Sequence, residues 1–376
     1  MSLSFARFRA VLVKEFIQMR RDRVTFAMMI GIPLMQLLMF GFAINGDPHH
    51  MPTLVEMADE GPLGRAILSG MRTSTYFDFQ GVVTGPDAGD GALRDGSASF
   101  IVVIPPGFER DVVRGLAPDI LLSADASDPA ASASAAAALA GIVQAAQTQF
   151  LVGPLARQAT SISPVGIVVH RQFNPEGRTA TNIVPGLLAI IMSMTMVMIT
   201  AVAIVRETER GTMEALLATP VRPMEVMLGK IMPYVAVGYV QTGLFLLAGK
   251  VIFDVPFLGG AWAFFIGFNL YIVTNLALGF LISTLTRSQM QAMQLSFFTL
   301  LPSILLSGFM FPFAGMPGWA QAIGSAIPAT HFLRLTRKVM LKGASLPDVA
   351  QDMGAILAIM AVIVTAAMLR YRRTLD

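Results

Sequence analysis

Apolar stretches that are almost free of charged residues recur along the chain. An α-helix needs about 20 residues to cross the roughly 30 Å of hydrocarbon in a bilayer. Six stretches of suitable length occupy 24–44, 180–205, 231–249, 260–284, 290–311 and 350–369. The pattern therefore predicts a polytopic α-helical membrane protein with six transmembrane helices.

The apolar stretch over 288–333 is long enough for two spans, but glycines and prolines interrupt it. Gly308, Pro312, Pro317 and Pro328 do not suit a second continuous helix. We therefore expect one span at 290–311, followed by a re-entrant or interfacial segment outside the cytoplasm over 312–348. Trp319 suits such a membrane interface.

Basic residues define the expected orientation, because they prefer the cytoplasmic ends of spans. They flank the predicted inner ends, as at Arg21, Arg206, Lys230 and Arg287 and in the tail over 370–376. A smaller basic group lies on the outer side and opposes this orientation: Arg334, Arg337, Lys338 and Lys342. We expect both termini in the cytoplasm. The segment 24–44 is longer than the apolar region of a signal peptide and is interpreted as a retained anchor.

The segment 45–179 has the pattern of a separate folded domain. Short runs of strand type occupy 52–57, 77–83, 99–104, 119–123 and 166–172. Helical patterns between them include 106–115 and a longer Ala-rich helix that begins at Asp128 and Pro129 and runs toward Arg157. This alternation predicts an α/β domain with a mostly parallel sheet. The orientation places it outside the cytoplasm.

Two segments are expected at the cytoplasmic surface. Over 1–23, apolar residues recur every three or four positions among basic ones, which predicts an amphipathic interface helix; packing against other protein is the alternative. Over 206–229, Met213, Leu216 and Leu217 form a short apolar face that ends before Pro220. This second segment is either a docking surface or a solvated charged loop.

Composition narrows the chemistry. Hydrophobic residues make up 54% of the 376-residue chain and charged residues only 14%, which excludes a nucleic-acid-binding surface. The chain has no cysteine, no phosphate-binding loop and no zinc-helix or nucleophile motif. His49 and His50 are adjacent linker residues that rarely bind one ion, so no metal site and no catalytic residue is predicted. The predicted span interiors also lack charge, which disfavours an ion-driven carrier.

A row of hydroxyl residues marks a possible substrate path in the span 290–311. The row recurs at helical spacing on one face and consists of Ser296, Thr299, Ser303 and Ser307. Small hydroxyl residues also serve helix packing in membranes, so both interpretations remain. Asn269 and Asn275 are expected to form interhelical hydrogen bonds. Alternate methionines over 192–198 spread around their helix and are expected to contact lipid or neighbouring helices.

The segment 207–230 resembles the cytoplasmic signature of type-2 ATP-binding-cassette (ABC) exporter permeases. It follows the family pattern E-x-E-R-G-T-x-E-x-L-L-x-T-P-V-R-P-x-E-x-x-x-G-K almost throughout. The order of an interface helix, one span, a large outer domain and five further spans also resembles the multidrug-type subgroup. The resemblance implies that the following residues contact an ATPase subunit: Glu207, Glu209, Arg210, Gly211, Thr212, Glu214, Leu217 and Pro220.

The same resemblance implies a permease subunit that is not itself an enzyme. Such a permease binds no cofactor directly: two separate ATPase subunits use ATP and magnesium, and a second permease, identical or related, completes the transporter. The expected location is a bacterial inner membrane, in contact with lipid. The expected function is export of an amphiphilic or hydrophobic substrate, drug-like or lipid-like, from the cytoplasm or inner leaflet. The alternative is a membrane-anchored envelope sensor or assembly protein with an extracytoplasmic binding domain.

Overall fold

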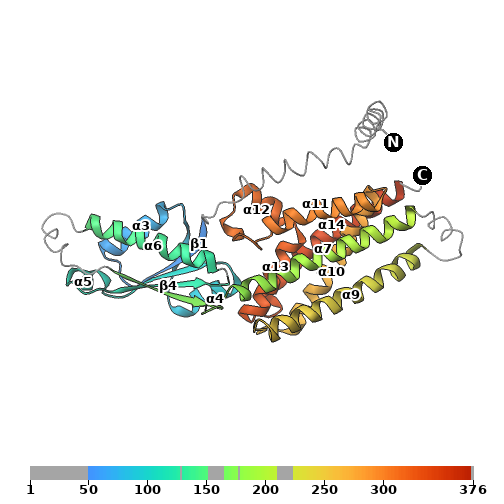
Figure 1. Cartoon of the computed structure of the whole chain (residues 1–376). Helices are drawn as coiled ribbons and strands as arrows, with labels where there is room; N and C mark the ends of the chain where they lie inside the picture. Colours follow the sequence, from blue (N-terminus) through green and yellow to red (C-terminus); the bar gives the residue numbers. More distant parts are fainter. Residues whose placement is uncertain (1–49, 128, 151–164, 177, 210–222, 374–376) are drawn as a thin grey trace, which may run out of the picture.

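The chain forms an α/β domain and a bundle of long helices, arranged end to end (Figure 1). The structure, a computed structural model, describes residues 50–127, 129–150, 165–176, 178–209 and 223–373. The expected interface helix over 1–23 and the expected span over 24–44 lie outside these residues.

Five strands form the single sheet of the described α/β domain, in the order β2-β1-β3-β4-β5. They are β1 (Met51–Met57), β2 (Phe77–Val83), β3 (Phe100–Ile104), β4 (Asp119–Asp125) and β5 (Gly166–Gln172). Only the β3–β4 pair is antiparallel. Each predicted strand run forms a strand, and the prediction of a mostly parallel α/β sheet is confirmed.

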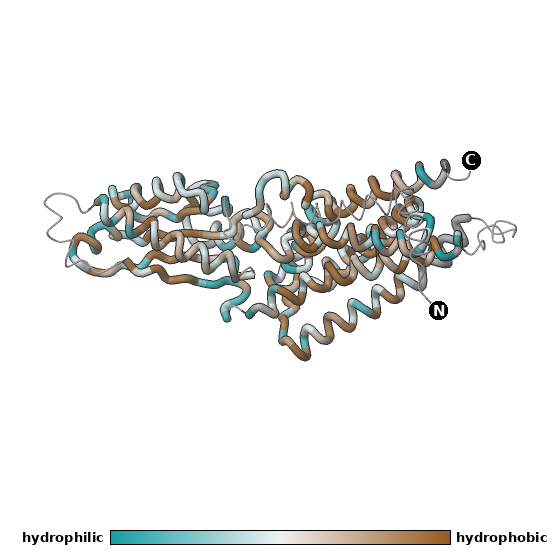
Figure 2. The backbone as a smooth tube through the Cα atoms, turned by 45° about the horizontal axis from the view of Figure 1, so that its top comes forward, coloured by the Kyte–Doolittle hydropathy of each residue, from teal (hydrophilic) through white to brown (hydrophobic). Residues whose placement is uncertain are grey.

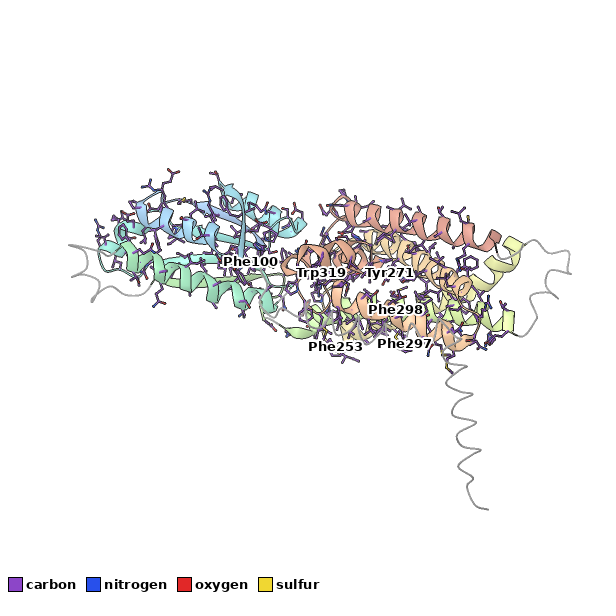
Figure 3. All side chains as sticks on the ribbon, turned by 90° about the horizontal axis from the view of Figure 1, so that it is seen from above. Phe100, Phe253, Tyr271, Phe297, Phe298 and Trp319 are labelled. Atoms are coloured by element: carbon purple, nitrogen blue, oxygen red, sulfur yellow. The ribbon has the colours of Figure 1, made fainter. Side chains whose placement is uncertain are left out.

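Helices α3 (Pro62–Thr73) and α6 (Pro129–Phe150) pack against each other and against the sheet. Proline at the first position of α6 fits the predicted start, since its missing N–H would have no partner there. The predicted helix over 106–115 is shorter, because Gly107 adopts a left-handed φ of 72° and α5 spans Phe108–Val113. Helix α4 is Pro86–Asp95. Phe100, labelled in Figure 3, is fully buried in the domain core.

The bundle contains long apolar helices (Figure 2). Its main helices are α7 (Thr179–Glu209), α9 (Pro223–Val251), α10 (Ala261–Leu285), α11 (Gln289–Leu306) and α14 (Ala350–Arg373). Among the described residues, four stretches are long and apolar enough to cross a membrane: Ala180–Arg206, Tyr234–Val251, Ala261–Leu285 and Pro347–Arg370. The chain thus has the helices of a multi-pass membrane protein, but the number six is not confirmed.

Helix α11 is absent from those four stretches, although 290–311 was expected to be a span. Gln289, Gln291 and Gln294 lie in its first turns and lower its apolar character. Pro302 lies inside the helix, and Gly308, with a left-handed φ of 85°, follows its end. The helix is therefore shorter and more polar than expected from the length of the apolar stretch.

Helix α10 lies against α7, α13 (Pro328–Lys342) and α14 and forms the centre of the bundle. Tyr271 on α10 is fully buried and stacks on Phe332, with ring centroids 4.1 Å apart. Its hydroxyl donates to the Ala189 carbonyl at 2.7 Å. A Cβ at Gly279 would lie 2.6 Å from the Val197 carbonyl oxygen, so glycine permits the close approach of α10 and α7.

The segment 312–348 folds into short helices beside this bundle. A 3₁₀ turn, η2 (Phe313–Gly315), precedes α12 (Gly318–Ser325) and α13, and η3 (Pro347–Val349) leads into α14. Helix α13 is largely buried against α7, α10 and α14. The prolines and glycines therefore interrupt the chain as expected, but α13 belongs to the packed bundle.

A buried carboxylate lies at the start of the stretch 350–369: Asp352, in the first turn of α14, is only 3% exposed. Its carboxylate accepts a hydrogen bond from Lys338 Nζ at 3.1 Å and lies 3.8 Å from His331 Nδ1. Both partners come from α13. A buried carboxylate is stable when such partners compensate it. The sequence pattern did not reveal that basic residues of α13 reach Asp352.

Lys342 connects the bundle to the α/β domain. Its side chain is 5% exposed, and its ammonium donates to Asp125 Oδ2 at 2.5 Å and to the Leu93 carbonyl at 2.8 Å. Asp125 ends β4 and also accepts from the Ser127 amide and hydroxyl. This buried ion pair explains why a lysine is present at the end of the bundle that faces the α/β domain.

We predict that Lys342→Met destabilises the protein by about 3 kcal/mol, because it leaves the Asp125 carboxylate without its buried cation. Thermal unfolding of the purified chain in detergent measures the loss. Adding Asp125→Asn should cost less than the sum of the two single changes.

The matched control is Lys250→Met. Lys250 also forms an ion pair, at 2.9 Å from Asp254 Oδ1, and thereby lowers the pKa of that carboxyl, but both side chains are exposed. This variant should unfold close to the wild type. Equal losses in both lysine variants would contradict a structural role for the buried pair.

Candidate functional site at the ends of helices α7, α9 and α11

The bundle end remote from the α/β domain brings together the end of α7 and the beginnings of α9 and α11 (Figure 1). Glu207 and Glu209 belong to the last turn of α7. The remaining residues expected to contact an ATPase lie outside the described residues: Arg210, Gly211, Thr212, Glu214, Leu217 and Pro220. The structure therefore fixes where this segment leaves the bundle and where it returns, at Pro223 in α9.

Glu209 links α7 to α11. The backbone N–H of Gln289 donates to Glu209 Oε1 at 2.9 Å, and the Gln289 side-chain amide donates to Oε2 at 2.5 Å. Gln289 is the first residue of α11, whose N-terminal N–H groups need acceptors and favour negative charge. The Ser288 hydroxyl supplies a further cap, because it accepts a hydrogen bond from the backbone N–H of Gln291. Glu209 thus has a role inside this chain.

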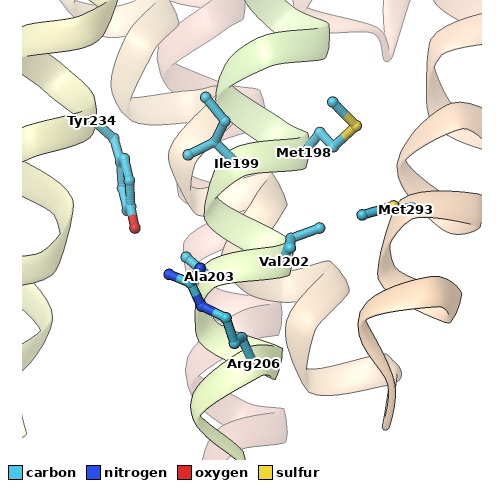
Figure 4. Close-up of a pocket in the computed structure, with 7 residues that line it drawn as sticks. All are labelled: Met198, Ile199, Val202, Ala203, Arg206, Tyr234 and Met293. Atoms are coloured by element: carbon cyan, nitrogen blue, oxygen red, sulfur yellow. The ribbon is translucent and has the colours of Figure 1, made fainter. Parts of the chain in front are cut away.

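A pocket of about 270 Å³ lies between α7, α9 and α11 (Figure 4). Helix α7 contributes most of the wall, α9 contributes Tyr234 and α11 contributes Met293. The lining residues are Met198, Ile199, Val202, Ala203, Arg206, Tyr234 and Met293. One guanidinium and one phenol stand among apolar and thioether groups, and flexible methionines suit variable ligands. The arrangement fits an amphiphile better than a small ion.

Helix α11, which carries most of the hydroxyl row, packs against α7. Ser296, Thr299 and Ser303 each donate to a carbonyl one turn earlier in their own helix, at 2.7 to 3.0 Å. Ser307 is fully buried, and its hydroxyl has no hydrogen-bond partner among the described residues. The contacts within this chain are those of helix packing, and none of the four residues lines the pocket. A substrate path along the row stays a prediction.

The two asparagines of α10 form interhelical hydrogen bonds, as predicted. Ser193 on α7 donates to Asn275 Oδ1 at 2.6 Å, and the Tyr239 hydroxyl on α9 donates to Asn269 Oδ1 at 2.5 Å. These bonds hold the three helices together in a region where apolar side chains give little directional preference.

The alternate methionines of α7 have different environments. Met192 and Met196 are fully buried in the bundle, and Met198 reaches the pocket. The sequence pattern singled out the methionine run, and it marked Arg206 as a sign of orientation and as the first residue of the segment 206–229, not as a pocket residue. It missed Tyr234 and Met293 because these residues come from separate helices, and no local pattern joins them to α7.

The long apolar helices, the inserted α/β domain and the segment that starts at Arg206 define the class: this is a polytopic transporter subunit. The model of the ABC-2 family transporter proteins matches residues 23–369, and the chain belongs to that family. Permeases of this family are non-catalytic membrane subunits, and the same holds for this chain.

Three bacterial relatives match nearly the whole chain. The probable multidrug ABC transporter permease YbhS of Escherichia coli (strain K12) is 32% identical, over 91% of this chain and 90% of the relative. The inner membrane transport permease YhhJ of the same strain is 29% identical, over 91% of this chain and 93% of the relative. The probable multidrug ABC transporter permease YbhR, also of Escherichia coli (strain K12), is 27% identical, over 98% of this chain and 99% of the relative.

We predict that Glu209→Ala loosens the start of α11, because two donors of Gln289 lose their acceptor. Loss of a capping interaction of about 1 kcal/mol raises the population in which the first turn of α11 is open roughly fivefold, and the amide exchange of that turn becomes faster by the same factor. Hydrogen–deuterium exchange of the peptide covering 287–295 measures the change. Glu209→Gln, which keeps an acceptor oxygen, should lie between Ala and the wild type.

Glu176→Ala is the control for this measurement. Glu176 is exposed, pairs with Arg178 and precedes the first residue of α7, at the other end of the helix from Glu209. Its removal should leave exchange over 287–295 unchanged. If Glu209→Ala also leaves it unchanged, the link between α7 and α11 does not stabilise the helix start.

Proposed function

We propose that this ABC-2 permease is the membrane half of an ATP-driven exporter that moves amphiphilic or hydrophobic molecules outward across a bacterial inner membrane. Two ATPase subunits bind and hydrolyse ATP, and a second permease, identical or related, completes the pathway. The names of YbhS and YbhR as probable multidrug permeases, and of YhhJ as an inner membrane permease, support the cargo class and location.

The observation that carries this proposal is the position of the pocket. Arg206 lines the pocket and is followed directly by Glu207, the first residue of the expected ATPase contact. A displacement of the segment 206–229 therefore acts on the pocket wall without an intermediate element. Through Glu209 and Gln289 the same displacement acts on α11, which supplies Met293 to the pocket.

The coupling mechanism follows from this arrangement. Closure of the ATPase pair presses on the segment 206–229 and favours one of two packings of α7, α9 and α11, as a ligand shifts a conformational equilibrium. The cargo binds with its apolar part against Met198 and Met293 and a polar or anionic group near Arg206. The shift in packing then releases it toward the outer end.

The proposed topology has six spans, both termini in the cytoplasm and the α/β domain outside. The pocket then faces the inner leaflet, from which an amphiphile enters sideways between helices. The joint formed by Lys342 and Asp125 lies at the outer surface.

We predict that Glu214→Lys uncouples the transporter, because charge reversal in the contact segment opposes binding of the ATPase. Co-purification of the ATPase and its turnover in proteoliposomes should both fall at least tenfold, with normal membrane insertion. Glu209→Lys should have the same effect but also disturb α11. Glu176→Lys, a charge reversal outside the contact segment, is the control. Wild-type association and turnover of Glu214→Lys would refute the docking role.

We predict opposite labelling of two single-cysteine variants, a direct test since the chain has no native cysteine. Glu60, which is exposed in the α/β domain, should react as Glu60→Cys with a membrane-impermeant maleimide in intact spheroplasts. Thr212→Cys should react only after the membrane is opened. The reverse pattern would place the α/β domain in the cytoplasm and exclude the proposed topology.

A further inference from the structure

Helix α13 carries four basic side chains, and two of them have buried acidic partners. Lys338 binds Asp352, and Lys342 binds Asp125. Arg334 differs from these lysines: within the described ranges it forms no salt bridge with a carboxylate, and its Nε is a buried donor without a hydrogen-bond acceptor. A buried guanidinium N–H without an acceptor is costly, which indicates a site for an additional acceptor.

The turn after α11 holds this guanidinium in place. The Cζ atom of Arg334 lies 4.7 Å from the centroid of the Phe313 ring. One turn further along α13, Arg337 Nη1 donates to the Gly308 carbonyl at 3.1 Å. Gly308 and Phe313 are close neighbours, since a Cβ at Gly308 would lie 3.2 Å from the Phe313 Cβ. Two guanidinium groups are therefore anchored on adjacent parts of one turn.

This turn and α12, which packs against Phe313 at Gly324, carry exposed apolar side chains. Met310 is 60% exposed, Trp319 is 45% exposed and Ile323 is 50% exposed. Figure 3 places Trp319 at the bundle end that faces the α/β domain, between Phe100 and Tyr271. Tryptophan together with exposed aliphatic groups is typical of the level of lipid headgroups, where one end of a side chain is apolar and the other wet.

We propose that Arg334 and Arg337 bind the phosphate group of a membrane phospholipid, whose acyl chains lie along Met310, Trp319 and Ile323. The planar guanidinium fork matches phosphate oxygens and supplies charge-assisted hydrogen bonds. Stacking on Phe313 orients the Arg334 fork in advance, which lowers the entropic cost of binding. The apolar rim distinguishes a phospholipid from a free anion. Assignment to the outer leaflet rests on the proposed function and its topology; the site itself does not.

The experiment measures lipid binding by the purified full-length chain, without an ATPase, by native mass spectrometry in detergent. Phosphatidylglycerol is the probe, and a diacylglycerol with the same acyl chains is the probe without phosphate. Arg334→Gln should weaken phosphatidylglycerol binding about tenfold, the factor for loss of a charge-assisted hydrogen bond. Diacylglycerol binding should not change. Arg334→Lys keeps the charge but loses the planar fork, so its affinity for phosphatidylglycerol should lie between those of the wild type and Arg334→Gln.

Arg72→Gln is the matched control. Arg72 stacks on Phe79 with Cζ 4.3 Å from the ring centroid, so the variant removes the same charge and the same kind of ring contact in the α/β domain. It should bind phosphatidylglycerol like the wild type. Equal weakening in Arg72→Gln and Arg334→Gln would show a general charge effect and overturn the proposed site.

Two further measurements distinguish a lipid phosphate from a free phosphate ion and separate a loss of binding from a loss of folding. If inorganic phosphate displaces phosphatidylglycerol at micromolar concentration, the site takes a free anion and the lipid assignment is wrong. If thermal unfolding shows that Arg334→Gln is unstable, Phe313→Leu replaces it and should weaken phosphatidylglycerol binding severalfold; wild-type binding would overturn the proposal. Because no ATPase is present, failure of the coupling proposal cannot cause either result.

Discussion

The buried ammonium of Lys342 is the constraint on which the joint between the two parts of the molecule depends. An ammonium removed from water costs several kcal/mol unless acceptors surround it. Both of its described acceptors, Asp125 and the Leu93 carbonyl, belong to the α/β domain, whereas the lysine ends a bundle helix. The position of the sheet relative to α13 is therefore determined by charge compensation as well as by apolar packing, which is less directional.

Helix α13 extends this constraint into the bundle. It packs against α7, α10 and α14, and its Lys338 compensates the carboxylate of Asp352. Helix α7 carries the pocket wall and ends at Glu209, the acceptor for α11. A continuous set of packed helices thus joins the pocket end to the α/β domain. In the proposed exporter, this set of helices transmits motion from the ATPase contact toward the outer surface.

Local patterns predicted the elements that depend on local physics. The five strand runs were found from alternation and turn residues, and the start of α6 from a proline at its first position. The interhelical bonds of Asn269 and Asn275 followed from the cost of leaving an amide unsatisfied among apolar side chains. Contacts between distant residues were not predicted. Glu209 and Gln289 are 80 positions apart, and Lys342 and Asp125 are 217 apart.

The sequence by itself determined the class of the protein: long apolar stretches require helices that satisfy their own backbone, and the segment after the second predicted span carries the family signature. The tertiary structure alone decided how the basic residues of α13 are used. Lys338 and Lys342 compensate buried carboxylates, and Arg334 lies on an aromatic ring. In the sequence these residues are simply basic positions on one helix. Their roles differ because the interaction of a charge depends on which partners folding brings within a few ångströms and on how much water remains between them.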